Sequence, residues 1–528
     1  MLITHLIRLE VRLSTLICNM DALFVESNTQ AGYQELGKVF SAIETPTWSL
    51  LLAQSCRAKG FGVGILDANA LRLSHEETAK KVTDAKPRLV VMVVYGQNPN
   101  SGTTNMTAAY ECAKQIKNFN PEVKLCFVGS HTSALPREVL SKPFVDFVLL
   151  NEGVYALHNL LKSDFSDEQL LSVRGIGWKP SGHCIPPVST LLNAPSPVVP
   201  QERMDIDLPG YAWDLLPYDK KPLDLYRAHF WHSNFDHNQR TPFASIYTSL
   251  GCRFGCDFCM INIINRQDSS EGISSADSRV MRFWSPEFII KEFEKLAGYG
   301  VRSLRLADEM FFLDKRYFDP LLNSIVNRDL KFNMWAYSRI DTVKDVYLDL
   351  FKRAGVNWLA LGVEAANQNI RHEISKGKFQ NVNIRDVAKK IRQADINVIS
   401  NYIFGFPDDT RETMQETLDL ALELNTEMAN MYPCQALPGS PLHARAKMNG
   451  TPLPQTPEEF GFLTYECKPL PTKHCSSEEV LRFRDEAWKK YFSNPEYLNL
   501  VESKFGKQQR RNVEDMSSVK VKRKLLGD

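Results

Sequence analysis

Residues 244–260 read ASIYTSLGCRFGCDFCM, a strand-like run that leads directly into a cysteine-rich loop. The loop places three cysteines with three and then two residues between them: Cys252, Cys256 and Cys259. Gly251 and Gly255 permit the positive φ angles that turn a short loop around a bulky inorganic ligand. Three thiolates on one loop suit a [4Fe-4S] cluster whose fourth iron has no protein ligand, and that iron is then open to bind another molecule.

A zinc site of three cysteines and one histidine is the alternative, with His232 or His237 as the fourth ligand. Zinc sites usually draw their ligands as two close pairs rather than as one run of three, so the spacing favours the cluster. His229 precedes the other two histidines, and all three are typical of polar loop residues near a domain boundary.

The chain after the loop alternates strand-like and helical patterns. The expected strands read RSLRLAD, KFNMWAYSR, WLALGVEA, INVISNYIFGF and MANMYPCQA. With the strand before the cysteines they make six β/α units, which predict a partial (β/α)6 barrel. The cysteines then lie at the carboxyl end of a barrel strand, where such folds carry their chemistry.

The chain before the loop shows the same alternation between Asp21 and about Lys162, with DALFV, GVGIL, RLVVMVV, KLCFVG and VDFVLL as strands. This predicts a doubly wound, flavodoxin-like parallel sheet, in which ligands bind beyond the carboxyl ends of the strands. Gly96, Gly129 and Gly153 fall at those ends and are candidate binding residues, although plain turns also place glycines there.

The chain has 528 residues, which predicts more than one domain, and it carries 63 basic and 62 acidic side chains. This balance predicts no global attraction to nucleic acid or acidic lipid. Eleven scattered cysteines favour a reducing, cytoplasmic setting over a disulfide framework. The first segment carries Arg8, Glu10 and Arg12 and predicts neither a membrane span nor an export signal; Met20 is a second candidate start.

Together, the three-cysteine motif and the sheet domain before it resemble the cobalamin-dependent radical S-adenosylmethionine enzymes. The resemblance runs from about residue 22 to 495 and includes PTWSLLLAQSCRAKGFGVGILDANAL and LPGSPLHARA. It implies a [4Fe-4S] cluster, S-adenosylmethionine and cobalamin as cofactors. The usual Asp-x-His-x-x-Gly is replaced by VESNTQAGY at residues 25–33, and His75 lacks the right neighbours. We therefore expect no histidine beneath the cobalt, or a domain that has lost cobalamin.

The same resemblance implies roles for single residues at the strand ends. Of Asp308 and Glu309, Glu309 is expected to meet the amino group of S-adenosylmethionine, with helix capping as its alternative. Arg339 is expected to meet the cosubstrate carboxylate, with a surface ion pair as its alternative. The remaining candidates are the aromatic Phe258 in the cysteine loop, Glu364 for the ribose, Gly405 for the adenosyl group, and Thr410, which begins the next helix.

These expectations divide the chain into an N-terminal extension (1–20), a cobalamin-binding-like domain (21–164), a connector on the surface (165–243), a radical S-adenosylmethionine core (244–440), a helical segment (441–500) and a basic, flexible tail (501–528). The function implied is methylation of an unactivated carbon in a small molecule, cell-envelope component or natural product, with electrons from flavodoxin or ferredoxin. The alternatives are cyclisation or oxidation without methyl transfer, and a non-enzymatic cobalamin- or metal-binding protein. The basic tail has no interleaved aromatic residues and does not predict nucleic-acid binding.

Overall fold

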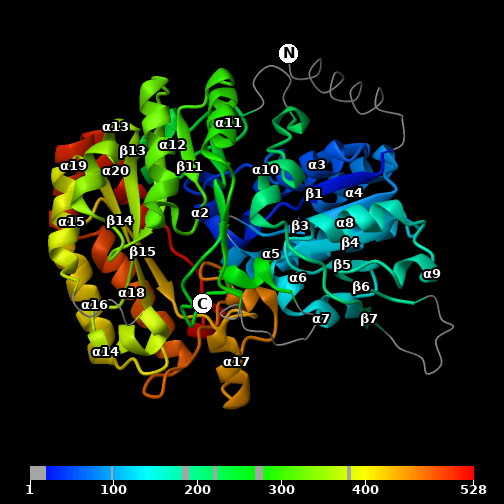
Figure 1. Cartoon of the computed structure of the whole chain (residues 1–528). Coiled ribbons are helices and arrows are strands. Elements are labelled where there is room, and N and C mark those ends of the chain that lie inside the picture. The colour runs from blue at the N-terminus through cyan, green and yellow to red at the C-terminus, as the bar shows by residue number, and fades with distance from the viewer. Residues whose placement is uncertain (1–19, 97–98, 181–189, 218–222, 268–277, 377–381) are drawn as a thin grey trace. The chain divides into compact units, whose positions relative to one another are not determined.

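The computed structural model describes residues 20–96, 99–180, 190–217, 223–267, 278–376 and 382–528. These residues form two compact units (Figure 1). The first unit contains the described residues of 20–29, 46–222 and 260–282, and the second those of 30–45, 223–259 and 283–528. No helix among the described residues is long and apolar enough to cross a membrane.

The first unit is built on a sheet whose parallel strands follow the order β2-β1-β3-β4-β5. Their bounds are β1 (Ala22–Glu26), β2 (Val63–Asp67), β3 (Leu89–Val94), β4 (Lys124–Gly129) and β5 (Phe147–Leu149). The side chains of β3 are all buried, as expected of a central strand covered on both faces. This order confirms the predicted doubly wound, flavodoxin-like sheet.

The helices of the first unit are α3 (Thr47–Ala58), α4 (His75–Ala85), α5 (Gly102–Phe119), α6 (Ser130–Ala134), α7 (Pro136–Ser141), α8 (Val154–Lys162), α9 (Asp167–Leu170) and α10 (Met204–Asp207). Buried residues of α4 and α5 join one apolar core with β1, β3 and β4. A capping box between Ser74 and Glu77 begins α4, and His75 is the first residue of this helix.

The predicted surface connector is wrong for part of its length. Two strands, β6 (Ile176–Trp178) and β7 (Leu191–Leu192), pair antiparallel beyond β5 and extend the first sheet. Further along, Asp207 is buried and accepts hydrogen bonds from Arg203 and Tyr155. The many prolines hid these pairings, because they interrupt the alternating pattern by which a strand is recognised.

The second unit contains six parallel strands that pair in chain order, and this confirms the predicted partial barrel. They are β8 (Phe243–Ile246), β11 (Ser303–Leu306), β12 (Asn333–Arg339), β13 (Val356–Glu364), β14 (Asn397–Phe404) and β15 (Met428–Pro433). The short strands β9 (Ser249–Gly251) and β10 (Met281–Phe283) lie between β8 and β11 in the sequence.

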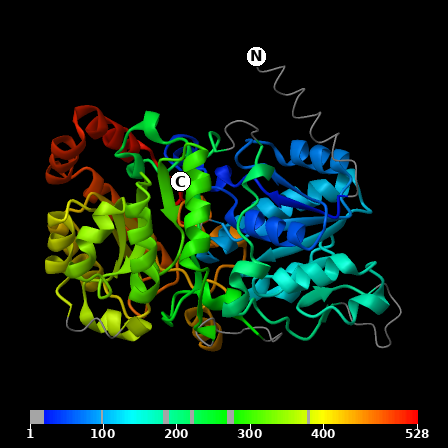
Figure 2. The same ribbon diagram turned by 45° about the horizontal axis from the view of Figure 1, so that its top comes forward.

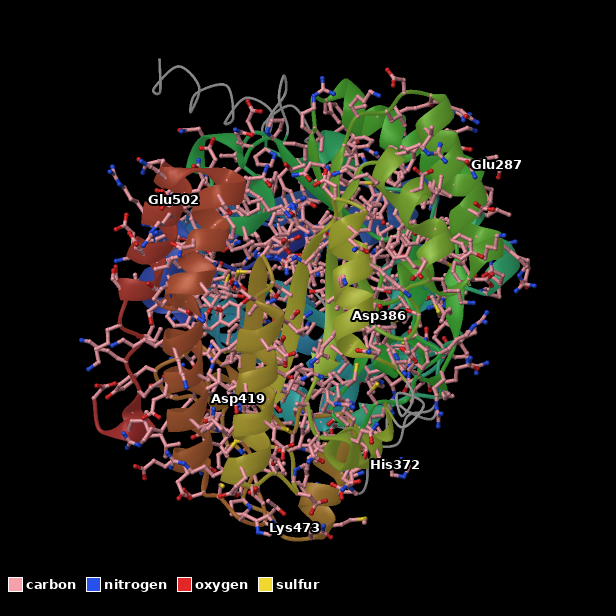
Figure 3. All side chains as sticks on the ribbon, turned by 90° about the vertical axis from the view of Figure 1, so that its left-hand side faces the viewer. Glu287, His372, Asp386, Asp419, Lys473 and Glu502 are labelled. Carbon is pink, nitrogen blue, oxygen red and sulfur yellow. The ribbon has the colours of Figure 1, made fainter. Side chains whose placement is uncertain are left out.

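Helices connect successive strands of this barrel, as the alternating pattern predicts (Figure 1). They are α11 (Pro286–Gly298), α12 (Lys315–Asn327), α13 (Leu348–Arg353), α14 (Gln368–Arg371), α15 (Ile384–Gln393) and α16 (Arg411–Leu424); α2 (Gln34–Val39) belongs to the same unit. Figure 3 shows the outer surface of this unit, where Asp386 of α15 and Asp419 of α16 are labelled. Asp386 pairs with Lys390, which is typical of a solvated helix face.

The register of the barrel strands sorts their side chains into layers. Arg305 of β11 lies beside Ser245 and Trp335, and Trp335 lies beside Trp358. Because successive side chains of a strand point to opposite faces, Tyr337 faces the same side as Trp335, one layer nearer the carboxyl ends. Four residues on this face of β12, β14 and β15 are only half-buried: Tyr337, Asn401, Asn430 and Tyr432.

The C-terminal segment consists of α17 (Pro441–Met448), α18 (Ser477–Phe492), α19 (Pro495–Phe505) and α20 (Lys507–Ser518). Figure 2 shows α19 and α20, in red, within the second unit. The predicted flexible tail is therefore wrong. Val513 and Met516 are buried, and the Arg523 side chain is only 1% exposed and forms two hydrogen bonds to Asp485, at 2.8 and 2.9 Å. Charge counting missed this pair, which joins residues 38 positions apart.

Candidate functional site

The cysteine loop begins where β9 ends. Gly251 has a φ of 89° at this turn, as the bend of the chain requires. Cys252 is buried, whereas Cys256 and Cys259 are half-buried. The N–H of Phe254 donates to Cys252 Sγ at 3.4 Å, and the N–H of Cys259 donates to the Cys256 carbonyl at 3.0 Å. Burial raises the pKa of Cys252 to about 12, so the thiolate needs a nearby cationic ligand such as iron.

The geometry does not favour the zinc alternative. His232 Nε2 lies 2.9 Å from the carbonyl of Asn333, the first residue of β12, and so sits at the amino-terminal edge of the sheet. His237 stacks against Phe230, with ring centroids 4.7 Å apart. Among the described residues, no group of three His, Cys, Asp or Glu side chains is arranged to hold one metal ion. The donor set that remains, three thiols on one loop, fits a multi-iron cluster.

Asp308 and Glu309 follow β11 and have different environments. The Asp308 carboxylate accepts from the Thr248 N–H at 2.9 Å, from the Thr248 hydroxyl at 2.8 Å, and from the Ser249 hydroxyl. The Oε1 atom of Glu309 is buried and has no hydrogen-bond partner among the described residues. Burial raises the pKa of Glu309 to about 7, against the opposing effect of Arg305. Of the two carboxylates, Glu309 thus retains hydrogen-bonding capacity for a ligand.

Arg339, at the end of β12, connects this strand with the cysteine loop. Its guanidinium group donates to both carboxylate oxygens of Asp341, at 2.9 and 2.7 Å. The same group stacks on the ring of Phe254, 3.8 Å from the centroid. The ion pair expected as an alternative is therefore present, but Arg339 is only 5% exposed, so the pair is not on the surface.

The two remaining candidate residues of the barrel, Glu364 and Gly405, lie at the ends of β13 and β14. Glu364 is buried and has a φ of 66°, an uncommon conformation for a side chain with a Cβ atom and one that is enriched at functional sites. Gly405 has a φ of 88°, and a Cβ atom there would collide with Val480 of α18. Packing against α18 thus accounts for this glycine by itself; contact with an adenosyl group stays a prediction. Thr410 caps α16 as predicted.

Phe258 packs against Phe406, the residue after Gly405, with ring centroids 5.6 Å apart. Phe406 in turn donates its N–H to Asp409, as does Gly405. The cysteine loop therefore contacts the turn after β14 as well as Arg339 of β12. Residues that the sequence places far apart are brought together around one loop.

In the first unit, the predicted glycines lie at the carboxyl ends of β3, β4 and β5. Gly96 and Gly153 have positive φ angles, 66° and 78°. A Cβ atom on Gly129 would collide with the carbonyl of Val94, so β3 and β4 approach closely there. Beyond Gly129, the Nε2 atom of His131 and the hydroxyl of Thr132 are buried and have no hydrogen-bond partner among the described residues, and His131 Nε2 lies 3.7 Å from Glu138 Oε1. These polar atoms without hydrogen bonds fit a polar ligand at this edge.

The structure also brings together residues that the sequence interpretation missed. Trp48 stacks on Tyr95 at 4.3 Å in the first unit, and Arg305 meets Glu44 at 3.0 Å in the second. Neither pair has a local sequence signal, because its members are 47 and 261 positions apart.

Comparison with known proteins agrees with these sites. The sequence model of the B12 binding domain matches residues 36–161, and that of the Radical SAM superfamily matches residues 246–421. The chain is a radical S-adenosylmethionine enzyme with an N-terminal B12 binding domain. Such domains use a [4Fe-4S] cluster, S-adenosylmethionine and cobalamin, which are the cofactors that the sequence predicts.

Three relatives define the similarity further. An uncharacterized methyltransferase of Pyrococcus horikoshii is 25% identical, over 83% of this chain and 85% of its own length. The anaerobic magnesium-protoporphyrin IX monomethyl ester cyclase of Cereibacter sphaeroides is 24% identical over 80% of this chain, which spans 63% of that relative. The structure of the radical S-adenosylmethionine methyltransferase TsrM from Kitasatospora setae, with tryptophan substrate and a cosubstrate analogue bound, superposes with a TM-score of 0.61, at 16% identity, over 94% of this chain and 98% of that chain.

Proposed function

We propose that this enzyme methylates a carbon atom of a small-molecule substrate. The observation that carries the proposal is the loop of Cys252, Cys256 and Cys259 on a half-barrel, in one chain with a doubly wound domain that has unpaired polar atoms beside Gly129. When bound, the cluster supplies reductive cleavage of S-adenosylmethionine, and cobalamin supplies methyl transfer. The protein binds and orients these groups and excludes water.

We assign the cosubstrate contacts to the strand ends of the barrel. The unpaired Glu309 Oε1 supports a hydrogen bond from the amino group of S-adenosylmethionine. The Arg339 guanidinium group stacks on Phe254 of the cysteine loop, which supports a contact with the cosubstrate carboxylate. Glu364 accepts from the ribose hydroxyls, and the backbone at Gly405 lies against the adenosyl group.

These assignments predict separate effects on cluster and cosubstrate. Changing the three loop cysteines together to Ala should remove the expected four irons and four sulfides, measured after anaerobic reconstitution. The matched control changes the buried Cys112 and Cys467 to Ala and should retain the cluster. Glu309→Gln should retain iron but weaken binding of S-adenosylmethionine at least tenfold. Full iron in the triple variant would refute the site.

A product analysis tests the reaction. With a strong reductant alone, the enzyme should form 5'-deoxyadenosine and methionine slowly; flavodoxin or ferredoxin is the electron donor that we propose in the cell. With its substrate, methylation consumes a second S-adenosylmethionine, so S-adenosylhomocysteine should appear in an amount similar to that of 5'-deoxyadenosine. Substrate turnover with 5'-deoxyadenosine alone would instead support cyclisation, which the similarity to the cyclase keeps open.

Cobalamin binding has its own test. The segment at residues 25–33, VESNTQAGY, contains no histidine, and its Asn28 side chain donates to the Leu73 carbonyl at 3.1 Å. The protein should take up cobalamin, and electron paramagnetic resonance of its cobalt(II) form should show no nitrogen superhyperfine splitting. A split signal would identify a protein nitrogen ligand and contradict the assignment.

A further inference from the structure

Arg305 is a buried cation on the inner face of the barrel. It lies on β11 in the same layer as Ser245 of β8 and Trp335 of β12, and only 1% of its surface is exposed. Its guanidinium carbon lies 4.8 Å from the centroid of the Trp335 ring and 5.6 Å from that of Tyr337. The charge therefore stands between the layer of Trp335 and the half-buried layer of Tyr337.

The side-chain nitrogens of Arg305 form no hydrogen bond with the residues that the structure describes. Glu44 Oε1 is 3.0 Å from Arg305 Nη1, but the groups are not aligned for a hydrogen bond. None of the three side-chain nitrogens of Arg305 has a hydrogen-bond partner among the described residues, and neither carboxylate oxygen of Glu44 has one with good geometry. His229 and Ser245 are nevertheless close enough to stabilise the Glu44 carboxylate. A buried ion pair is stabilising only when additional hydrogen bonds satisfy its atoms. This pair therefore lacks what a purely structural pair needs.

Glu44 is held in place by its chain neighbour. The hydroxyl of Thr45 donates to the Ser245 carbonyl at 3.1 Å and accepts from the Ser245 N–H at 3.0 Å, which attaches this segment to edge strand β8. His229 Nε2 lies 3.3 Å from Glu44 Oε1. Burial alone would raise the pKa of Glu44, but Arg305 and His229 lower it to about 2, so the carboxylate is charged.

An aromatic cluster closes the layer around Arg305. Trp231 contacts both Trp335 and Trp358, with ring centroids 5.1 and 5.2 Å apart, and His229 stacks on Trp231 at 5.3 Å. The layers nearer the carboxyl ends are half-buried at Tyr337, Asn401, Asn430 and Tyr432. The Arg305–Glu44 pair thus lies beneath the part of the barrel interior that remains accessible, with hydrogen-bonding capacity of both kinds.

We propose that the Arg305–Glu44 pair binds the head group of the substrate, and that this head group is an α-amino acid zwitterion. The substrate carboxylate accepts from Arg305, and its ammonium donates to Glu44. A lone carboxylate would leave two negative charges against one positive charge, and a lone ammonium would leave the reverse imbalance. A zwitterion keeps the buried site neutral and uses both the donors and the acceptors. The inference rests on the proposed function, since it assigns the substrate of that reaction.

Three probes of similar shape test the charge requirement. L-Phenylalanine, 3-phenylpropionate and phenethylamine present a zwitterion, an anion and a cation on one phenyl group. Isothermal titration of the fully reconstituted enzyme with S-adenosylmethionine should show that L-phenylalanine binds at least tenfold more tightly than either other probe. Equal binding, tighter binding of a charged probe, or no binding of any probe would overturn the proposal.

Two single variants add a readout that a structural role would not produce. Glu44→Gln removes the acceptor of the ammonium, so the variant should bind L-phenylalanine about tenfold more weakly than the unchanged enzyme and 3-phenylpropionate more tightly. Arg305→Met should weaken the binding of L-phenylalanine and strengthen that of phenethylamine. If 3-phenylpropionate gains no affinity in the Glu44→Gln protein, which retains the shape of the side chain, or if phenethylamine gains affinity there, the assignment is wrong.

A double variant guards against misfolding. Glu44→Gln with Arg305→Met leaves no uncompensated charge and should abolish L-phenylalanine binding, with iron content and thermal unfolding as checks on the fold. The matched control, Asp485→Asn with Arg523→Met, removes a hydrogen-bonded pair elsewhere in the unit and should retain binding. S-adenosylmethionine cleavage, measured separately, distinguishes the two proposals: cleavage without probe binding refutes only the head-group site.

Discussion

Asp308, which follows β11, accepts two hydrogen bonds from Thr248, one from the backbone N–H at 2.9 Å and one from the hydroxyl at 2.8 Å. Thr248 stands four residues before the first cysteine of the cluster loop. The carboxylate therefore holds the chain in position just before it turns into that loop. This relationship gives Asp308 a structural role, whereas Oε1 of its neighbour Glu309 has no hydrogen-bond partner among the described residues.

Asp308→Asn should lower both stability and cluster content. The amide presents N–H groups where the carboxylate accepts from buried donors, and a lost hydrogen bond to a charged group costs about 1.5–3 kcal/mol. We expect a decrease of about 3 kcal/mol in the free energy of unfolding and less iron after reconstitution. Asp329→Asn, at a side chain that is 79% exposed, is the control and should change neither. Unchanged iron and stability in the Asp308 variant would contradict this role.

Gly405→Ala should destabilise the enzyme by two separable effects. Alanine at a φ of 88° is strained by about 1 kcal/mol, and its Cβ atom would meet Val480. We expect a total cost of more than 2 kcal/mol in urea unfolding. Adding Val480→Ala should relieve the collision but not the strain, so the double variant should lose less stability than the two single losses added together. Simple additivity would show that the collision does not limit this position.

Glu26 should make stability depend on pH. Burial raises the pKa of Glu26 to about 8. The hydrogen bond from Ser49 lowers this pKa, and the negative charge of Asp67, its partner on β2, raises it. The folded protein then keeps the proton from about pH 4.5 to 8, where the unfolded chain has lost it, so stability falls as pH rises through this window by up to about 1.4 kcal/mol per pH unit.

Glu26→Gln removes this titration. Relative to the unchanged protein, the variant should therefore gain stability between pH 5 and pH 8, measured by urea unfolding without cofactors. A stability difference that stays constant over this range would contradict the raised pKa.

Arg523→Met should show that the C-terminal segment belongs to the folded unit. The substitution leaves Asp485 without two hydrogen bonds and the Thr464 carbonyl without one. Breaking such a pair costs about 3 kcal/mol, which should appear in thermal unfolding and in faster proteolysis near the C-terminus. Lys507→Met, on the same segment, is a control for loss of charge. Equal stability of the two variants would support a tail that is not packed.

The strands of both sheets could be predicted because each one carries its own signal. Runs such as RLVVMVV bury both faces of β3, and the observed strand, Leu89–Val94, differs by one residue at its start. The connector and the tail could not be predicted in this way. β6 and β7 are three and two residues long, and Arg523, which follows α20, hydrogen-bonds to the distant Asp485.

By itself, the sequence determined the order of the two sheets and the three-cysteine loop, because hydrophobic periodicity and ligand spacing are local properties of the chain. Only the tertiary structure decided which polar side chains keep hydrogen-bonding capacity. Asp308 and Glu309 are adjacent in the sequence, yet Asp308 accepts hydrogen bonds from Thr248 and Ser249, whereas Glu309 Oε1 has no hydrogen-bond partner in the described part of the chain. Arg305 and Glu44 meet only because β11 and the segment attached to β8 are neighbours. Such pairings depend on contacts between distant residues, which no local pattern records.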